Sequence, residues 1–133
     1  MIAYVCPSVR RVTGSFAMAF VVAMCFSSCG FWSETELVKS SISPNGVIVA
    51  DWYQISGGGA AGWSRDRVRL RPANEKFATG NDYSFDAISA DKIELEWASD
   101  TELRVRYPSD AAVTKSEPKW NDIAIALDPT LKP

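Results

Sequence analysis

Residues 92–107, KIELEWASDTELRVRY, decide the fold, because they contain two segments that match each other in both hydrophobicity and charge. Apolar residues alternate with glutamates in the first half and mostly with arginines in the second half. Ser99, Asp100 and Thr101 between the halves have the composition of a turn. We therefore expect two antiparallel strands joined as a hairpin.

The register of this hairpin follows from placing its apolar side chains on one face. Opposed residues of an antiparallel pair share a face of the sheet. The apolar pairs are then Trp97 with Leu103 and Leu95 with Val105. The same register gives two ion pairs, Glu94 with Arg106 and Glu96 with Arg104. Because two independent patterns agree, we expect one buried and one exposed face.

Outward from the hairpin, four more segments have the composition of strands. They are residues 47–55, 63–71, 83–88 and 120–127. The first is apolar on both faces, which is typical of a central strand, and the links at 73–82 and 109–118 are polar. No segment of this part has convincing helical periodicity. The chain is thus predicted to be mostly β: a single antiparallel sheet of about six strands, folded as a small sandwich or open barrel.

The N-terminal part differs in charge from the rest of the chain. The first 33 residues contain Arg10 and Arg11 and no acidic residue. Residues 14–28, GSFAMAFVVAMCFSS, carry no charge and are rich in Ala, Val, Phe and Met. They are shorter than the roughly 20 residues that a membrane-spanning helix needs. A basic start, a short apolar stretch and small residues after it indicate a secretory signal.

The end of this stretch, Ser27-Ser28-Cys29-Gly30, resembles a lipobox, the cleavage site of bacterial lipoproteins, with Phe26 where leucine is usual. We expect cleavage before Cys29 and lipid on its sulfur, and several acyl chains are enough for stable anchoring. A plain secretory signal or an uncleaved anchor are the alternatives. After this cleavage Cys29 is the only cysteine left, so it cannot form an internal disulfide.

These observations divide the chain into a lipoprotein signal peptide at 1–28, a tether at 29–42 and a small all-β domain at 43–133. Within the tether, Ser33 and Glu36 have the spacing of a capping box, which predicts a short helical turn. The expected location is outside the cytoplasm, on the outer side of the inner membrane or in the outer membrane. In a Gram-negative cell, Gly30 after Cys29 favours the outer membrane.

One strand has an unusual row of four arginines. Arg65, Arg67, Arg69 and Arg71 alternate with Asp66, Val68 and Leu70, so they share one strand face. Such a row extends about 20 Å and suits the phosphates or carboxylates of a polyanion. The alternative is a row paired with Asp and Glu on neighbouring strands.

A glycine-rich segment, residues 57–62, precedes this strand and lacks the Gly-Lys-Ser/Thr ending of a phosphate loop. We expect it to be a flexible hairpin loop. The chain has five tryptophans, and most should help to build the core. Trp63, which borders the glycine loop, is the best candidate for contact with a glycan or a partner.

The composition excludes several functions. The chain has no histidine, and lipid on Cys29 would leave no thiol, so we expect no catalytic residue, metal site or cofactor. Glu94 and Glu96 are the one carboxylate pair worth weighing, but the opposed arginines would keep both ionised. All 16 acidic residues follow the leader, whereas two of the 14 basic ones lie within it. The net acidic body argues against nucleic acid.

Three motifs together resemble a family of small exported bacterial lipoproteins of unknown function. They are the turn Ser43-Pro44-Asn45-Gly46, the pair Arg71-Pro72 and the hairpin around residues 93–103. The resemblance implies an exported β-sheet domain and assigns no catalytic residue. We expect a non-enzymatic envelope protein, anchored to a membrane through Cys29, that acts by protein or glycan contacts. The alternatives are a polyanion-binding module and a secreted inhibitor or immunity-type protein.

Overall fold

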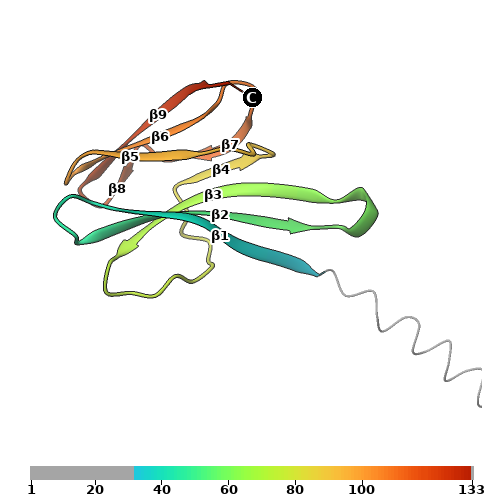
Figure 1. Ribbon diagram of the computed structural model, residues 1–133, viewed down its shortest axis with the longest axis horizontal. Coiled ribbons are helices and arrows are strands. Elements are labelled where there is room, and N and C mark those ends of the chain that lie inside the picture. The colour runs from blue at the N-terminus through green and yellow to red at the C-terminus, as the bar shows by residue number, and fades with distance from the viewer. Residues whose placement is uncertain (1–31, 133) are drawn as a thin grey trace, which may run out of the picture. The chain divides into compact units, whose positions relative to one another are not determined.

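A computed structural model describes residues 32–132, and this part of the chain is mostly β (Figure 1). Its strands are β1 (Ser33–Ile42), β2 (Ile48–Gly57), β3 (Trp63–Pro72), β4 (Phe85–Ile88), β5 (Glu94–Ser99), β6 (Glu102–Pro108), β7 (Ala112–Ser116), β8 (Lys119–Trp120) and β9 (Ile123–Leu131). A single 3-10 turn, η1 (Gly59–Ala61), lies in the β2–β3 link, and the described residues contain no α-helix.

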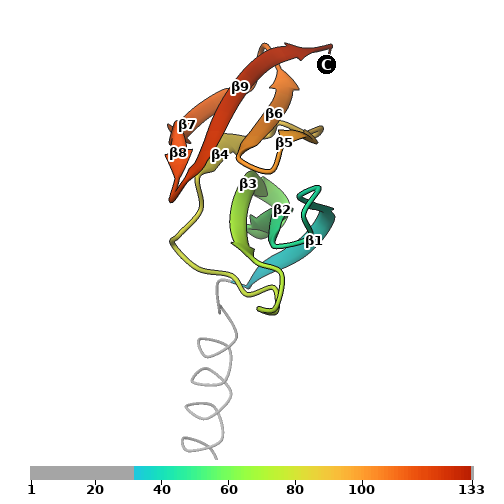
Figure 2. The ribbon, with the colours of Figure 1, turned by 90° about the vertical axis from the view of Figure 1, so that its left-hand side faces the viewer.

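The strands form two sheets that pack like a sandwich. The larger sheet has the order β1-β2-β3-β4-β7 and is antiparallel throughout, and the smaller has the order β5-β6-β9-β8. Figure 2 shows β1 to β3 in one layer and β5, β6 and β9 in the other. The expectation of a mostly β, sandwich-like domain is confirmed, but two sheets and nine described strands replace one sheet of about six.

The predicted hairpin is confirmed in its pairing and register. β5 and β6 pair antiparallel, and all four predicted partners stand opposite each other: Glu94 with Arg106, Leu95 with Val105, Glu96 with Arg104 and Trp97 with Leu103. Leu103 and Val105 are fully buried, whereas Glu96 is exposed. The alternation therefore identified both the partners and the buried face.

The core lies between the two sheets. The larger sheet contributes Ala50, Val68, Leu70, Phe85 and Ala87, and the smaller contributes Leu95, Leu103, Val105, Ile123 and Ile125. The Phe85 ring packs on Tyr107 with their centroids 5.0 Å apart. Burial of apolar area contributes about 25 cal/mol per Å², so the burial of this whole cluster between the sheets is the main stabilising term.

The expected tether is wrong for residues 33–42, which form β1. This strand pairs antiparallel with β2 from Ser33–Gly57 to Ile42–Val49, with a bulge between Leu37 and Lys39. Nearly all of its side chains are exposed. A helix this short is marginal in water, so the capping pattern alone does not sustain it, whereas backbone pairing with β2 stabilises the strand.

The C-terminal part differs from expectation in two ways. The polar stretch after Pro108 contains β7, which pairs with β4 at the edge of the larger sheet. The last strand, β9, runs parallel to β6 rather than antiparallel. A parallel pair needs a long crossover, and residues 109–122, which pass through β7 and β8, provide it.

Candidate functional site

The four arginines of β3 form one row on the face away from the core, as predicted. Their guanidinium groups are already paired with carboxylates of β2, β4 and the loop after β3. The pairs are Arg65–Asp86 (3.3 Å), Arg67–Asp86 (2.7 Å), Arg69–Asp82 (2.8 Å) and Arg71–Asp51 (2.6 Å). Asp51 and Asp86 are fully buried. Of the two interpretations of this row, the structure therefore shows the paired one.

Residues 73–82, here called the strap, fold against this arginine row. Arg69 donates a hydrogen bond to the carbonyl of Ala78, and Arg71 donates one to the carbonyl of Glu75. The guanidinium groups of Arg69 and Arg71 therefore bind strap carbonyls as well as carboxylates. All four guanidinium groups are ion-paired, and the strap also binds Arg69 and Arg71, so the row offers little free positive charge to an incoming polyanion.

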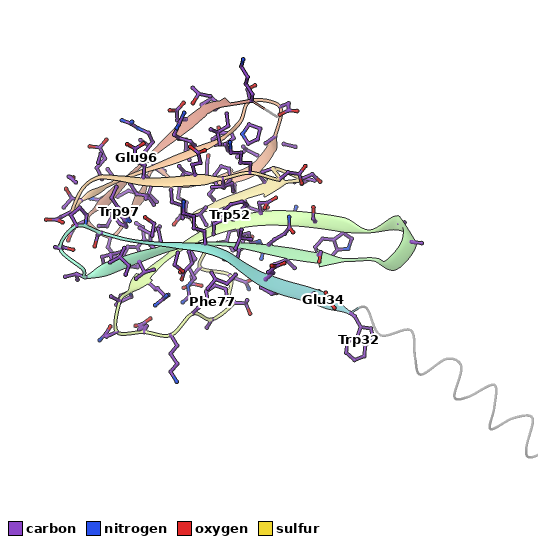
Figure 3. The ribbon with its side chains drawn as sticks, viewed as in Figure 1. Trp32, Glu34, Trp52, Phe77, Glu96 and Trp97 are labelled. Atoms are coloured by element: carbon purple, nitrogen blue, oxygen red, sulfur yellow. The ribbon has the colours of Figure 1, made fainter. Side chains whose placement is uncertain are left out.

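Aromatic contacts complete the layer under the strap. Phe77 belongs to the strap (Figure 3), and its ring meets the Tyr53 ring of β2 edge-on, with the two ring centroids 5.4 Å apart. The Arg67 guanidinium lies 4.0 Å from the centre of the Tyr83 ring. Burial raises the pKa of the Tyr53 hydroxyl, although the nearby Arg67 opposes this effect. Burial alone would lower the pKa of Arg67, but its hydrogen bond to Asp86 contributes to a net rise. Both pKa shifts arise from burial and from pairing between groups of the domain itself, as in a packed structural layer.

A different surface has the features of a contact site: an open depression of about 540 Å³ at the end of the β2–β3 hairpin. Trp32 and Trp63 border it, and their residues are 83% and 45% exposed. Its other walls are glycines and polar residues, namely Glu34, Ser56, Ser64 and Ser89. We call it the tryptophan depression. Two exposed indoles beside hydroxyl groups can contact an apolar face and a polar group at once.

The glycines of the hairpin fix the position of Trp63. A Cβ atom on Gly57 would lie 3.1 Å from Cζ2 of Trp63, and one on Gly58 would lie 2.9 Å from its Cδ1. Gly58 also has a φ of +89°, a conformation that other residues rarely adopt. The indole therefore rests against bare backbone, which supports one of its faces.

The other tryptophans help to build the core, as expected for most of the five. Trp52 donates from Nε1 to Asp66 at 2.9 Å, and Trp97 donates from Nε1 to the carbonyl of Ser41 at 3.1 Å. Together with Trp120, both pack against the buried cluster. Sequence reasoning identified Trp63 but missed Trp32 beside it, because the pairing of Ser33 with Gly57 was not expected.

A buried carboxylate without a cationic partner was also missed. Asp66 is fully buried and accepts hydrogen bonds from Trp52 Nε1 and from the backbone amide of Ala90 at 3.0 Å. The sequence does contain an indication of this buried carboxylate, because Asp66 shares a strand face with the apolar Val68 and Leu70. These bonds tie β2, β3 and the link after β4 together, so its role is structural.

The carboxylate pair considered for catalysis is engaged in ion pairs. Glu94 lies 2.9 Å from Nη1 of Arg106, and Glu96 lies 3.8 Å from Nη1 of Arg104. Both contacts match the predicted register. Across residues 32–132 no three His, Cys, Asp or Glu side chains are grouped so that they could hold a metal ion.

Cys29 and the signal segment lie outside the described residues. Within the described part, no helix has the length and apolar character needed to cross a membrane. Comparisons of the chain with protein-family models, curated proteins and solved structures found no match. The resemblance to exported lipoproteins therefore stays a prediction.

Proposed function

We propose that this chain is an exported bacterial lipoprotein, anchored through Cys29, whose β domain acts by binding rather than by catalysis. The observation that carries the proposal is the segment Phe26-Ser27-Ser28-Cys29, which follows a basic start and a short apolar stretch. The lack of histidine supports a binding role. The ion pairing of Glu94 and Glu96 supports it as well.

Labelled palmitate tests the anchor directly. Cells expressing the full chain are compared with cells expressing Cys29→Ser and Cys25→Ser. Cys25 lies in the apolar stretch four residues earlier, so its variant is the matched control. The wild type and Cys25→Ser should incorporate the label, and Cys29→Ser should not. Label retained by Cys29→Ser would refute the anchor.

One observation favours protein contact over a free-standing domain. Ile42 and Val47 are 61% and 56% exposed and flank the β1–β2 turn. This turn lies at the opposite end of the β1–β2 ladder from Ser33 and Gly57. An anchored domain would thus present two exposed apolar residues on the side away from its anchor, and a partner that covered them would bury apolar area.

A photo-reactive residue at position 47 tests this surface in cells. We expect an adduct of one defined mass, because a specific contact places the same neighbour beside the probe. A probe at the exposed Asp110, in the turn after β6, is the control. The same set of adducts from both positions would show random collision and argue against the contact.

A further inference from the structure

We propose that the end of the domain that carries Trp32 and Trp63 sits in the lipid headgroup layer, so that the domain stands directly on the membrane. This inference rests on the proposed lipid at Cys29. The occupant of the tryptophan depression is then a lipid surface, with its glycerol and headgroup region against the two indoles.

The first support is the length of chain between the anchor and the fold. Three residue steps separate Cys29 from Trp32, and they span at most about 11 Å. Each headgroup region is about 5–7.5 Å thick, since the whole bilayer measures about 40–45 Å and its hydrocarbon core about 30 Å. Because β1 begins at Ser33, the chain between Cys29 and the fold is too short to lift the domain far from the surface.

The second support is the position of the β2–β3 hairpin. Ser33 pairs with Gly57. The hairpin continues beyond this pair through η1 to Trp63. Figure 1 shows the hairpin tip extending past the start of β1. The tip therefore lies at the same end of the domain as Trp32, where a surface held near Trp32 can also contact it.

The third support is the chemistry of the tip. Residues 55–64, ISGGGAAGWS, contain no charged side chain. The residues of η1 are small and exposed, so this end has little bulk and no charge to desolvate. Among the residues that line the depression, Glu34 is the one that carries a charge. An uncharged surface enters the headgroup region at low cost.

The fourth support is the exposure of the two indoles. Tryptophan favours the membrane–water interface because its ring is apolar and its N–H is polar. Trp32 is the most exposed large apolar residue of the described part. Exposed aromatic rings also suit a sugar, so a glycan is the competing occupant. The short reach from Cys29 favours the lipid surface, because a glycan would have to enter between the domain and its own membrane.

The test uses the full chain, isolated from cells in its processed form. Its mass first establishes whether Cys29 carries lipid. The protein is then placed in phosphatidylethanolamine vesicles whose acyl chains carry bromine, which quenches nearby indoles. We expect quenching in the wild type and loss of most of it in the double variant Trp32→Phe, Trp63→Phe. Trp120→Phe is the control, because Trp120 packs against the core and belongs to β8, which Figure 1 shows at the end of the domain away from the hairpin tip. It should keep the quenching.

The outcomes separate the two proposals. A mass without lipid would refute the anchor, and with it the inference. Lipidated protein that shows no more quenching than the double variant would overturn the inference alone. A glycan would be the occupant of the depression if soluble N-acetylglucosamine oligomers changed the fluorescence spectrum of Trp63 and the vesicles produced no quenching. Quenching that persists at high salt would support the lipid contact, because an uncharged contact is not screened.

Discussion

Arg71 Nε donates to Oδ2 of the buried Asp51 at 2.6 Å, and this contact crosses diagonally from β3 to β2. Asp51 stands opposite Arg69 in the ladder, so Arg71 reaches back by two residues. The hydroxyl of Ser40 on β1 donates to the same carboxylate at 2.5 Å. One carboxylate thus joins three strands, and through Arg71 it also reaches the strap at Glu75.

The substitution Asp51→Ala should lower the free energy of unfolding by about 3–5 kcal/mol, because it leaves a mostly buried guanidinium without its partner. Glu96→Ala is the control. Its pair with Arg104 is long, at 3.8 Å, and exposed on both sides, so the expected loss is about 1 kcal/mol or less. Urea denaturation of a soluble form that starts at residue 30 measures both. Equal losses would mean that the Asp51 contact is not a buried pair.

Leu103→Ala should cost about 2–5 kcal/mol, because it opens a cavity in the fully buried core face of β6. Leu37→Ala, on the exposed edge strand β1, should change stability by only about 0.5 kcal/mol. The same denaturation experiment compares the two. A larger effect at Leu37 would show that the exposed and buried faces are assigned the wrong way round.

The hairpin of β5 and β6 could be predicted because its apolar and charged residues alternate together, and both patterns require the same register. The edge strands β1 and β7 could not be predicted in this way. Most of their side chains face solvent, so burial imposes no alternation on them. Backbone hydrogen bonds hold these strands in place, and such bonds impose no pattern on the side chains that could be recognised in the sequence. The parallel pairing of β6 with β9 depends on the path of residues 109–122, which is a non-local property.

The candidate site was predictable in part for the same reason. Alternation placed the four arginines on one face, but their partners Asp51, Asp82 and Asp86 come from other segments. Trp63 could be identified as a candidate contact residue because it directly follows the glycine-rich segment. Trp32 reaches the same depression only because β1 pairs with β2, and that pairing has no sequence signal.

Alkaline pH should destabilise the domain through Tyr53. Burial raises its pKa above 10, so the folded state keeps the hydroxyl proton when the unfolded state releases it. This contribution to stability is complete below pH 10 and is lost as the pH rises through the folded pKa. Tyr53→Phe should therefore flatten the fall in stability above pH 10. Denaturation midpoints at several pH values test this, and an unchanged slope would contradict it.

The soluble domain should not bind polyphosphate, even at low salt. All four arginines of β3 are ion-paired, and two of them also bond to the strap. The domain is net acidic, so long-range attraction is absent too. Titration followed by calorimetry tests this. Saturable binding that Arg67→Gln abolishes would restore the polyanion hypothesis.

The last prediction concerns the glycines beneath Trp63. Gly58→Ala brings a Cβ to within 2.9 Å of Cδ1 of Trp63 at a φ of +89°, so either the ring or the loop must move. We expect a red-shifted emission and easier quenching by acrylamide, since the displaced ring loses its backbone support. Gly59→Ala is the matched control. Its φ is also positive, at +58°, but its Cβ would meet nothing within 4 Å.

Gly59→Ala should therefore cost only the left-handed conformation, about 1–2 kcal/mol, and leave the spectrum of Trp63 unchanged. Identical spectra for the two variants would show that Trp63 does not rest on Gly58. In brominated vesicles the lipidated Gly58→Ala chain should also lose part of its quenching relative to Gly59→Ala, because of these two glycines Gly58 alone lies against the indole. The two glycines, adjacent in the chain, thus separate backbone strain from the placement of the ring.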